Sequence, residues 1–141
     1  MVEELIRKFQ AGGLSVQVYE TQKALGREAA EQAAGFLKNA IRQRGKARVL
    51  FSAANSQLEM VASLTSLSGV DWSAVEAFHL DEYVGLSTSH PESFGGWLKR
   101  EVVDKVSPGK VHYLAGDAQE PEKECRRYAD LLSRAPIDLS F

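Results

Sequence analysis

The sequence predicts a three-layer α/β fold, in which a mostly parallel sheet lies between helices on both faces. The chain has 141 residues, of which 44% are hydrophobic and 26% charged, so it can form one packed domain. Apolar runs of strand length, at residues 48–51 and 75–80, alternate with amphipathic helical segments. Such a βαβ order implies parallel strands, with ligands expected beyond their carboxyl ends.

The amino-terminal part predicts a helix, a strand and a long second helix. Apolar residues recur at helical spacing over residues 2–9 and stop at two glycines, which predicts a short helix. Residues 14–18 alternate between apolar and polar side chains, as in an edge strand. Thr21 is a helix cap, and the apolar stripe that follows predicts a helix that ends at Gly45.

The next segment supplies the centre of the predicted sheet. Residues 48–51 form a strand buried on both faces, followed by a small polar turn at residues 52–56. A second amphipathic helix stops near Gly69, and residues 75–80 form the following strand. The turn at 52–56 and the loop at 81–90 are therefore expected at the same edge of the sheet.

The last part of the chain continues the α/β pattern. It predicts a helix over residues 93–104, a short strand over 111–114 and a helix over 121–134. Residues 136–141 resemble an emerging strand, and we interpret the chain as incomplete at its carboxyl end. Residues 1–141 are then a single α/β domain, the amino-terminal part of a longer catalytic domain.

Composition excludes several kinds of partner. A net charge of -2 gives no surplus of cations for a nucleic acid, and no apolar run approaches the roughly 18 residues of a membrane span. The single cysteine, Cys125, excludes an internal disulfide and a multi-cysteine metal site, fits a cytoplasmic location, and is expected in the core. The sequence leaves homo-oligomerisation open.

The segment with the clearest chemistry is the end of the 75–80 strand, where two carboxylates, Asp81 and Glu82, follow the apolar run. Ligands bind at this position in α/β sheets. A carboxylate partly shielded by the strand end and by aromatic neighbours can abstract a proton from a carbon beside a carbonyl. Spacing alone also allows the pair to cap a following turn or helix.

Residues 81–86, Asp-Glu-Tyr-Val-Gly-Leu, are followed by His-Pro-Glu-Ser-Phe at 90–94. This pattern resembles the signature of the glucosamine-6-phosphate deaminases, a Rossmann-like family in the 6-phosphogluconolactonase-like superfamily. The resemblance implies an enzyme that converts glucosamine-6-phosphate to fructose-6-phosphate and ammonia without a cofactor or a metal. Asp81 would be the general base that moves a proton between C2 and C1 through an enediol or enolamine, with Glu82 and Tyr83 in supporting roles.

The resemblance also implies what this chain lacks. The family's ring-opening histidine lies in a motif just downstream of the strand that begins at residue 137, so the fragment alone is expected to be inactive. His79 and His112 do not match that motif and are expected to be structural. His90 belongs to the loop signature.

The family's phosphate loop corresponds to Ser52, Ala53, Ala54, Asn55 and Ser56, which are the predicted phosphate-binding residues. Ala54 and Asn55 replace the two glycines that let backbone N–H groups approach a phosphate. Ser56 is either a phosphate ligand or a plain helix cap. Two alternative functions therefore remain. One is a 6-phosphogluconolactonase-type hydrolase, although Tyr83 stands where those enzymes usually have arginine, and the other is a non-catalytic sugar-phosphate-binding or sensing protein.

Overall fold

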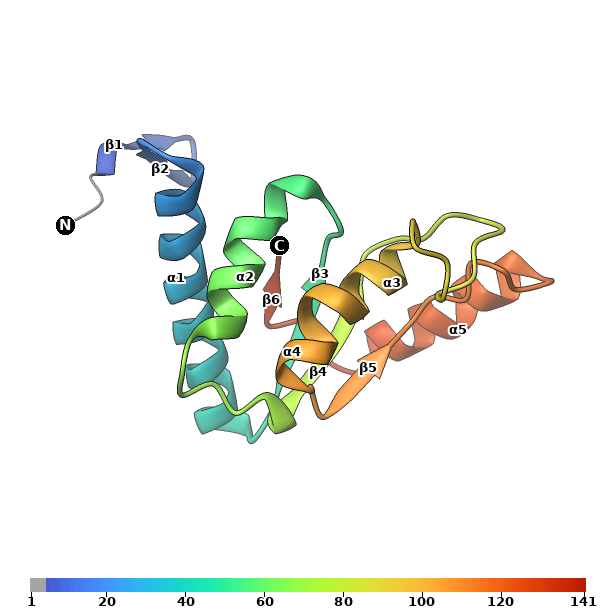
Figure 1. Cartoon of the computed structure of the whole chain (residues 1–141). Helices are drawn as coiled ribbons and strands as arrows, with labels where there is room; N and C mark the ends of the chain where they lie inside the picture. The colour runs from blue at the N-terminus through green and yellow to red at the C-terminus, as the bar shows by residue number, and fades with distance from the viewer. Residues whose placement is uncertain (1–4) are drawn as a thin grey trace.

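A parallel sheet forms the centre of the fold in the computed structural model, which describes residues 5–141 (Figure 1). Its strand order is β5-β4-β3-β6, and each neighbouring pair is parallel. The strands are β3 (Ala47–Phe51), β4 (Val75–His79), β5 (Lys110–His112) and β6 (Leu139–Ser140). The predicted strands, including the emerging strand near the carboxyl end, are confirmed.

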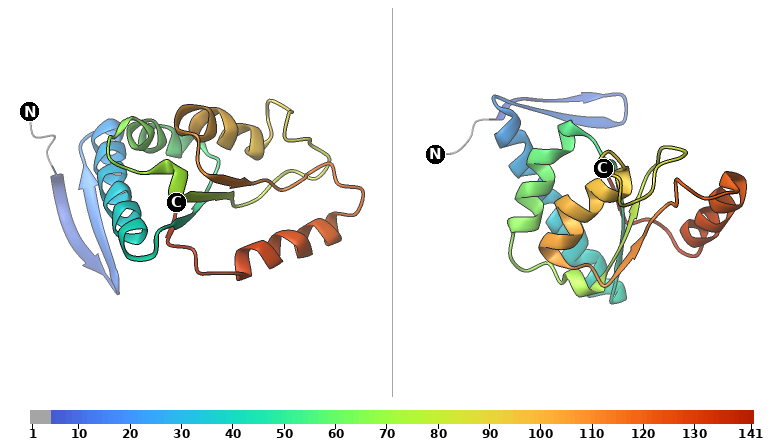
Figure 2. Two further views of the ribbon diagram at one scale, coloured as in Figure 1. Left: turned by 90° about the horizontal axis from the view of Figure 1, so that it is seen from below. Right: turned by 45° about the vertical axis from the view of Figure 1, so that its right-hand side comes forward.

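Helices cover both faces of this sheet, as predicted (Figure 2). One face carries α1 (Gln22–Arg44), α2 (Leu58–Ser66) and a helical segment made of α3 (Phe94–Leu98), η3 (Lys99–Val103) and α4 (Asp104–Val106). The opposite face carries α5 (Pro121–Ser133). Helix α1 has the predicted ends, because the Thr21 hydroxyl accepts the N–H of Ala24 and Gly45 adopts a left-handed conformation with φ 75°.

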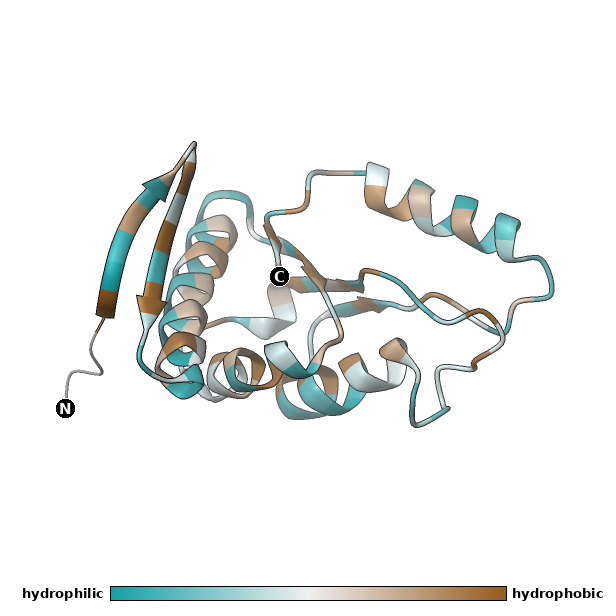
Figure 3. Ribbon diagram, turned by 90° about the horizontal axis from the view of Figure 1, so that it is seen from above, coloured by the Kyte–Doolittle hydropathy of each residue, from teal (hydrophilic) through white to brown (hydrophobic). Residues whose placement is uncertain are grey.

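The helix predicted over residues 2–9 is wrong where the structure describes it. Strands β1 (Leu5–Ala11) and β2 (Leu14–Tyr19) form an antiparallel hairpin that lies beside α1 and is separate from the main sheet (Figure 2). Hydrophobic and hydrophilic residues alternate from Leu14 to Val18 along β2 (Figure 3). A short apolar run fits either period, and pairing with residues 14–19 selects the strand. Residues 2–4 of that prediction lie outside the described part.

The helix predicted over residues 93–104 contains a change of helical type. The Ser93 hydroxyl accepts the N–H of Gly96 and caps α3. The next turn, η3, is π-helical, and the last one ends at Ser107, whose φ is 48°. Two 3₁₀ turns, η1 (Asn55–Gln57) and η2 (Trp72–Ala74), precede α2 and β4. Helix α2 ends before Gly69, at the extended residue Leu67.

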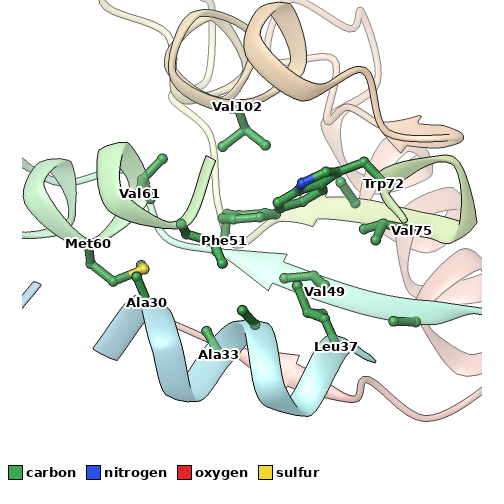
Figure 4. Packing of buried hydrophobic residues seen from close by; sticks show 14 of the residues in the cluster. Ala30, Ala33, Leu37, Val49, Phe51, Met60, Val61, Trp72, Val75 and Val102 are labelled. Atoms are coloured by element: carbon green, nitrogen blue, oxygen red, sulfur yellow. The ribbon is translucent and has the colours of Figure 1, made fainter. Parts of the chain in front are cut away.

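The main core lies between the sheet and α1, α2 and η3 (Figure 4). Alternate residues of the central strands face it, among them Val49, Phe51 and Val75. Leu37 of α1 and Val102 of η3 are fully buried against them. Burial of such side chains contributes about 1.5–3 kcal/mol each before conformational entropy is subtracted.

The face that packs against α5 is polar by comparison. Arg48 is only 2% exposed, and its guanidinium donates hydrogen bonds to the carbonyl oxygens of Leu131, Leu132 and Ala135 at the end of α5. It also pairs with Glu76 at 3.1 Å, across the β3–β4 register. Arg48 therefore fastens α5 to the sheet.

The ion pair extends across a third strand. Glu76 also lies 2.7 Å from Nε2 of His112, and the ring of Phe78 stacks between His112 and the Arg48 guanidinium. Partial burial alone would raise the pKa of Glu76, but the hydrogen bond from His112 and the charge of Arg48 lower it. His112 is thus a structural histidine, as expected.

Replacing Arg48 with Met keeps most of the aliphatic stem and removes every guanidinium hydrogen bond. Carbonyl groups at the end of α5 and the Glu76 carboxylate then lose a buried partner, so we expect the free energy of unfolding to fall by about 3 kcal/mol. Urea unfolding measures this. Arg134→Met, at an exposed position at the end of α5, is the control; equal effects of the two changes would show that Arg48 does not hold α5.

Candidate functional site

The candidate site lies at the carboxyl edge of the sheet, where β3 and β4 end at the same level. Phe51 pairs with His79, and the N–H of Leu80 donates to the carbonyl oxygen of Phe51 at 2.9 Å. The loops at 52–56 and 81–90 therefore leave the sheet side by side. Their predicted placement at one edge is confirmed.

Asp81 stands at the start of the second loop with an exposed side chain. It lines a hollow of about 280 Å³ together with Glu82, Gly116 and Glu124. The shielding that the sequence led us to expect around Asp81 is absent among residues 5–141, and no side chain in that range hydrogen-bonds its carboxylate. The carboxylate oxygens are thus open to a ligand.

Glu82 has a different environment although it is the next residue. Its Oε1 accepts the N–H groups of Tyr83 and Phe94, at 2.9 and 3.0 Å, and its Oε2 accepts that of Gly95 at 2.8 Å. A carboxylate is favoured at the free N–H groups of a helix start. Glu82 therefore ties the 81–86 signature to the 90–94 signature by capping α3.

The 81–86 loop is also held by close packing. The ring of Tyr83 lies 4.6 Å from that of Phe94, and the N–H of Gly85 donates to the carbonyl oxygen of Gly116 at 2.7 Å. A Cβ on Gly116 would lie 2.3 Å from the backbone carbonyl oxygen of Tyr83, so only glycine fits there. Sequence reasoning missed Gly116, for which a lone glycine after a strand is the only signal.

His79, the last residue of β4, is 1% exposed. Its Nδ1 lies 2.9 Å from the carbonyl oxygen of Asp81, and its Nε2 lies 2.9 Å from the nitrogen of Leu114. Burial lowers the pKa of His79, and the Asp81 carbonyl and the Glu82 and Asp81 carboxylates partly oppose this. The ring is a buried and fully hydrogen-bonded group, as expected of a structural histidine.

The 52–56 loop leads directly into a helix. The Ser52 hydroxyl donates to the carbonyl oxygen of Phe141 at 2.6 Å, and Asn55 begins η1, which continues into α2. Neither η1 nor α2 has a side-chain cap, so Ser56 does not serve as the helix cap that was one of its two interpretations. Ser107 is the only non-glycine residue with positive φ among those described, so this loop needs no glycine for its backbone conformation.

A second hollow, of about 220 Å³, lies between this loop and the 91–94 segment. Ala53, Ala54 and Asn55 line one side, while Trp97 and Arg100 line it from the α3–η3 helical segment. Sequence reasoning missed Arg100, although Ser93, Trp97 and Arg100 have the spacing of one helical face. Its exposed guanidinium has no partner within residues 5–141.

The predicted site residues thus line two hollows rather than one. Asp81 lines the first hollow and residues 53–55 line the second. Glu82 lines the first and Phe94 the second, and the Phe94 N–H donates a hydrogen bond to the Glu82 carboxylate. Cys125, expected in the core, is exposed and lines the Asp81 hollow, so that prediction is wrong.

No group of three or more His, Cys, Asp or Glu side chains among residues 5–141 could hold a metal ion. No helix in that range is long and apolar enough to cross a membrane.

Comparison with known proteins gives a consistent set of relatives. Residues 20–140 match the family model described as glucosamine-6-phosphate isomerases/6-phosphogluconolactonase. A glucosamine-6-phosphate deaminase of Arthrobacter sp. (strain FB24) is 42% identical over 77 residues, which are 52% of this chain and 30% of that protein. Another, of Thermoanaerobacter sp. (strain X514), is 30% identical over 120 residues, 81% of this chain and 47% of that protein.

Solved structures show the same fold. The 6-phosphogluconolactonase from Plasmodium vivax superposes with a TM-score of 0.79 at 9% identity, over 94% of this chain and 48% of that one. The chain therefore spans about half the length, or less, of the proteins it matches.

The cap made by Glu82 can be tested by two substitutions. Glu82→Ala leaves three N–H groups without their acceptor, and we expect the free energy of unfolding to fall by about 2 kcal/mol. Glu82→Gln keeps one acceptor oxygen and is expected to cost roughly half as much. Urea unfolding measures both, with Glu92→Ala on the exposed loop as the control. A Glu82→Ala protein as stable as the control would show that the carboxylate does not anchor α3.

Proposed function

Because the chain belongs to the glucosamine-6-phosphate isomerase/6-phosphogluconolactonase family, we propose that the protein carrying it converts glucosamine-6-phosphate to fructose-6-phosphate and ammonia. Asp81 is the general base in this proposal. The observation that supports it most is the exposed, unpaired carboxylate of Asp81 directly after β4, at the sheet edge that also holds the 52–56 loop. The choice of glucosamine-6-phosphate as substrate rests on the relatives that are glucosamine-6-phosphate deaminases.

The proposed chemistry needs a base on one face of the C1–C2 bond of the open sugar. The Asp81 carboxylate removes the proton from C2, and the electron pair of that C–H bond forms the C1=C2 bond of an enolamine as the aldehyde oxygen gains a proton. The same carboxylate returns the proton to C1, since one group can serve both steps when the substrate is held in place, and this leaves an imine at C2. Water then adds to C2, and the amine takes up a proton and leaves as ammonia, so that C2 becomes the ketone. No external oxidant or reductant is needed.

Glu82 and Tyr83 support the base in this proposal and do not react. The Glu82 carboxylate accepts three backbone N–H groups, which use most of its acceptor positions and fix it in place. Tyr83 packs on Phe94 and keeps the loop against α3. This division of roles gives the two adjacent acids different tasks through their different environments.

The phosphate is assigned to the hollow beside the 52–56 loop. Ser52, Ala53, Ala54, Asn55 and Ser56 are the proposed phosphate-binding residues, and the N–H groups of Asn55 and Ser56 at the start of η1, which no side chain caps, favour an anion. Arg100 adds an unpaired positive charge on the facing wall of the same hollow. This charge offsets the loss of the two glycines found in the family's loop.

The rest of the active site is supplied, in this proposal, by parts of the protein outside these 141 residues. The chain spans about half of its relatives, and the histidine that opens the sugar ring is expected downstream of β6. We place the protein in the cytoplasm, where a sugar phosphate is available and a single cysteine stays reduced.

A lactonase activity on 6-phosphogluconolactone is the second candidate, and the fold shared with the Plasmodium vivax lactonase favours it. Tyr83 argues against it, because the resemblance places an arginine there in lactonases. Parallel assays of the intact protein on both substrates separate the two. Calorimetric binding of glucosamine-6-phosphate without turnover of either substrate would instead identify a sensing protein.

Asp81→Asn removes the base and keeps the shape of the side chain. We expect ammonia release from glucosamine-6-phosphate to fall by about 10²- to 10⁴-fold, the usual contribution of a positioned general base. Asp130→Asn, an exposed aspartate on α5, is the control and is expected to retain full activity. Undiminished turnover in the Asp81→Asn protein would remove Asp81 from the mechanism.

Arg100→Gln tests the phosphate side of the site. We expect KM for glucosamine-6-phosphate to rise about tenfold, because one charge-assisted hydrogen bond is worth about 1.5 kcal/mol or more. The change should leave kcat within about twofold, since the interaction is the same in the ground and transition states. Arg134→Gln serves as the matched control. An unchanged KM would separate Arg100 from substrate binding.

A further inference from the structure

His79 occupies a place between the strand ends and the proposed base. It is the last residue of β4, is 1% exposed, and its ring reaches forward to the main chain of Asp81. The other ring nitrogen meets Leu114, just beyond β5. One imidazole thus connects the backbone of Asp81 with the end of a neighbouring strand.

The two partners determine where the ring carries its proton. The N–H of Leu114 can only donate, so Nε2 must accept it with a lone pair. The carbonyl oxygen of Asp81 can only accept, so Nδ1 must carry the hydrogen. This arrangement suits a neutral imidazole with its proton on Nδ1 and no other form of the ring.

The backbone of His79 is fixed independently of its ring. The hydroxyl of Tyr128 accepts the His79 N–H at 2.9 Å and donates to the His79 carbonyl oxygen at 2.8 Å. Burial raises the pKa of Tyr128 to about 12, so the hydroxyl keeps its proton at neutral pH. The His79 ring therefore starts from a fixed backbone, and its hydrogen bond to Asp81 holds the Asp81 main chain at a fixed distance from β4.

We propose that His79 is a positioning residue for Asp81: its neutral ring, with the proton on Nδ1, holds the Asp81 main chain against the end of β5. The inference deepens the proposed function and depends on it for its kinetic consequence. The ring touches no reacting atom in this arrangement. Its effect is to set where the carboxylate of Asp81 stands relative to the sugar.

A second proton would break the arrangement. Protonation of Nε2 places a hydrogen against the N–H of Leu114, so that two donors face each other. The titratable groups that face the ring are Asp81 and Glu82 from the loop, Tyr113 beyond β5 and Tyr128 from α5. The two carboxylates favour a charged ring, and burial opposes it more strongly.

The first experiment reads the ring directly in the ¹⁵N-labelled protein. Nitrogen–proton correlation spectra from pH 8 to pH 6 are expected to show Nδ1 protonated and Nε2 unprotonated throughout. A free histidine derivative in the same buffers titrates near about 6.5 and is the reference. A proton on Nε2 at neutral pH overturns the proposal. So does a ring that takes up its second proton at the same pH as the free histidine derivative or at a higher one. Both results count whether or not the enzyme assay succeeds.

The second experiment uses two amides that each copy half of the ring. In His79→Asn the side-chain NH₂ can reach the place of Nδ1 and keep the bond to Asp81, whereas His79→Gln places its oxygen near Nε2 and keeps the bond to Leu114. We expect kcat to fall within about threefold for Asn and between about tenfold and a hundredfold for Gln, with KM little changed. Equal losses of kcat in the two variants, or a larger loss for Asn, overturn the proposal.

The pH dependence of stability provides a third readout that needs no activity. The pKa of His79 is lowered in the folded protein, so stability from the neutral ring is fully present above about pH 6.5 and is lost as the pH falls toward the folded value. The urea midpoint of the wild type should therefore drop more between pH 7.5 and 5.5 than that of His79→Asn. Parallel profiles would contradict the proposal. If instead Asp81→Asn proves fully active, the proposed function fails while these readouts of the ring still stand.

Discussion

The parallel pairing of β3 with β4 is the constraint on which the rest of the site depends. Because Phe51 and His79 face each other at the last rung, both strands stop together and release their loops at one edge. A shift of one residue would turn every side chain of a strand to the opposite face and move one loop away from the other. The exposed Asp81 and the buried His79 are consequences of where that rung lies.

The two faces of the sheet contribute to the site in different ways. The face under α1 and α2 is apolar and supplies a rigid platform, while the face under α5 contains the row formed by Arg48, Glu76 and His112. Tyr128 of α5 acts on the site directly, because its hydroxyl hydrogen-bonds both the N–H and the carbonyl oxygen of His79 at the end of β4. Helix α5, the helix most distant from the 52–56 loop in the chain, thus helps to fix the edge where the ligand is proposed to bind.

Much of the fold could be predicted from the sequence because its signals are local and repeated. The long row of apolar residues in α1, with a threonine before it and a glycine after it, fits only a helix. The short apolar run of β3 predicts a buried strand equally clearly. Residues 5–11 were assigned wrongly because so short an apolar run fits both periods, and only the pairing with β2 decides. The 81–94 signature singled out Asp81, and the order of elements singled out the 52–56 loop; the structure places both at one edge of the sheet, and their roles stay predictions. Arg100 and Gly116 could not be found this way, since their importance comes from atoms far away in the sequence.

The π-helical turn η3 changes which way the helix around Arg100 faces. An α-helix advances about 100° per residue, so a turn with one residue more than usual rotates everything after it by that amount relative to everything before. In an ordinary α-helix Trp97 and Val102 would point about 140° apart, whereas the π-helical turn brings them to nearly the same side, where both pack on the core cluster. The turn behaves as a one-residue insertion accommodated within a helix. A lineage that lost that residue would keep the helix and lose the relation between its two ends.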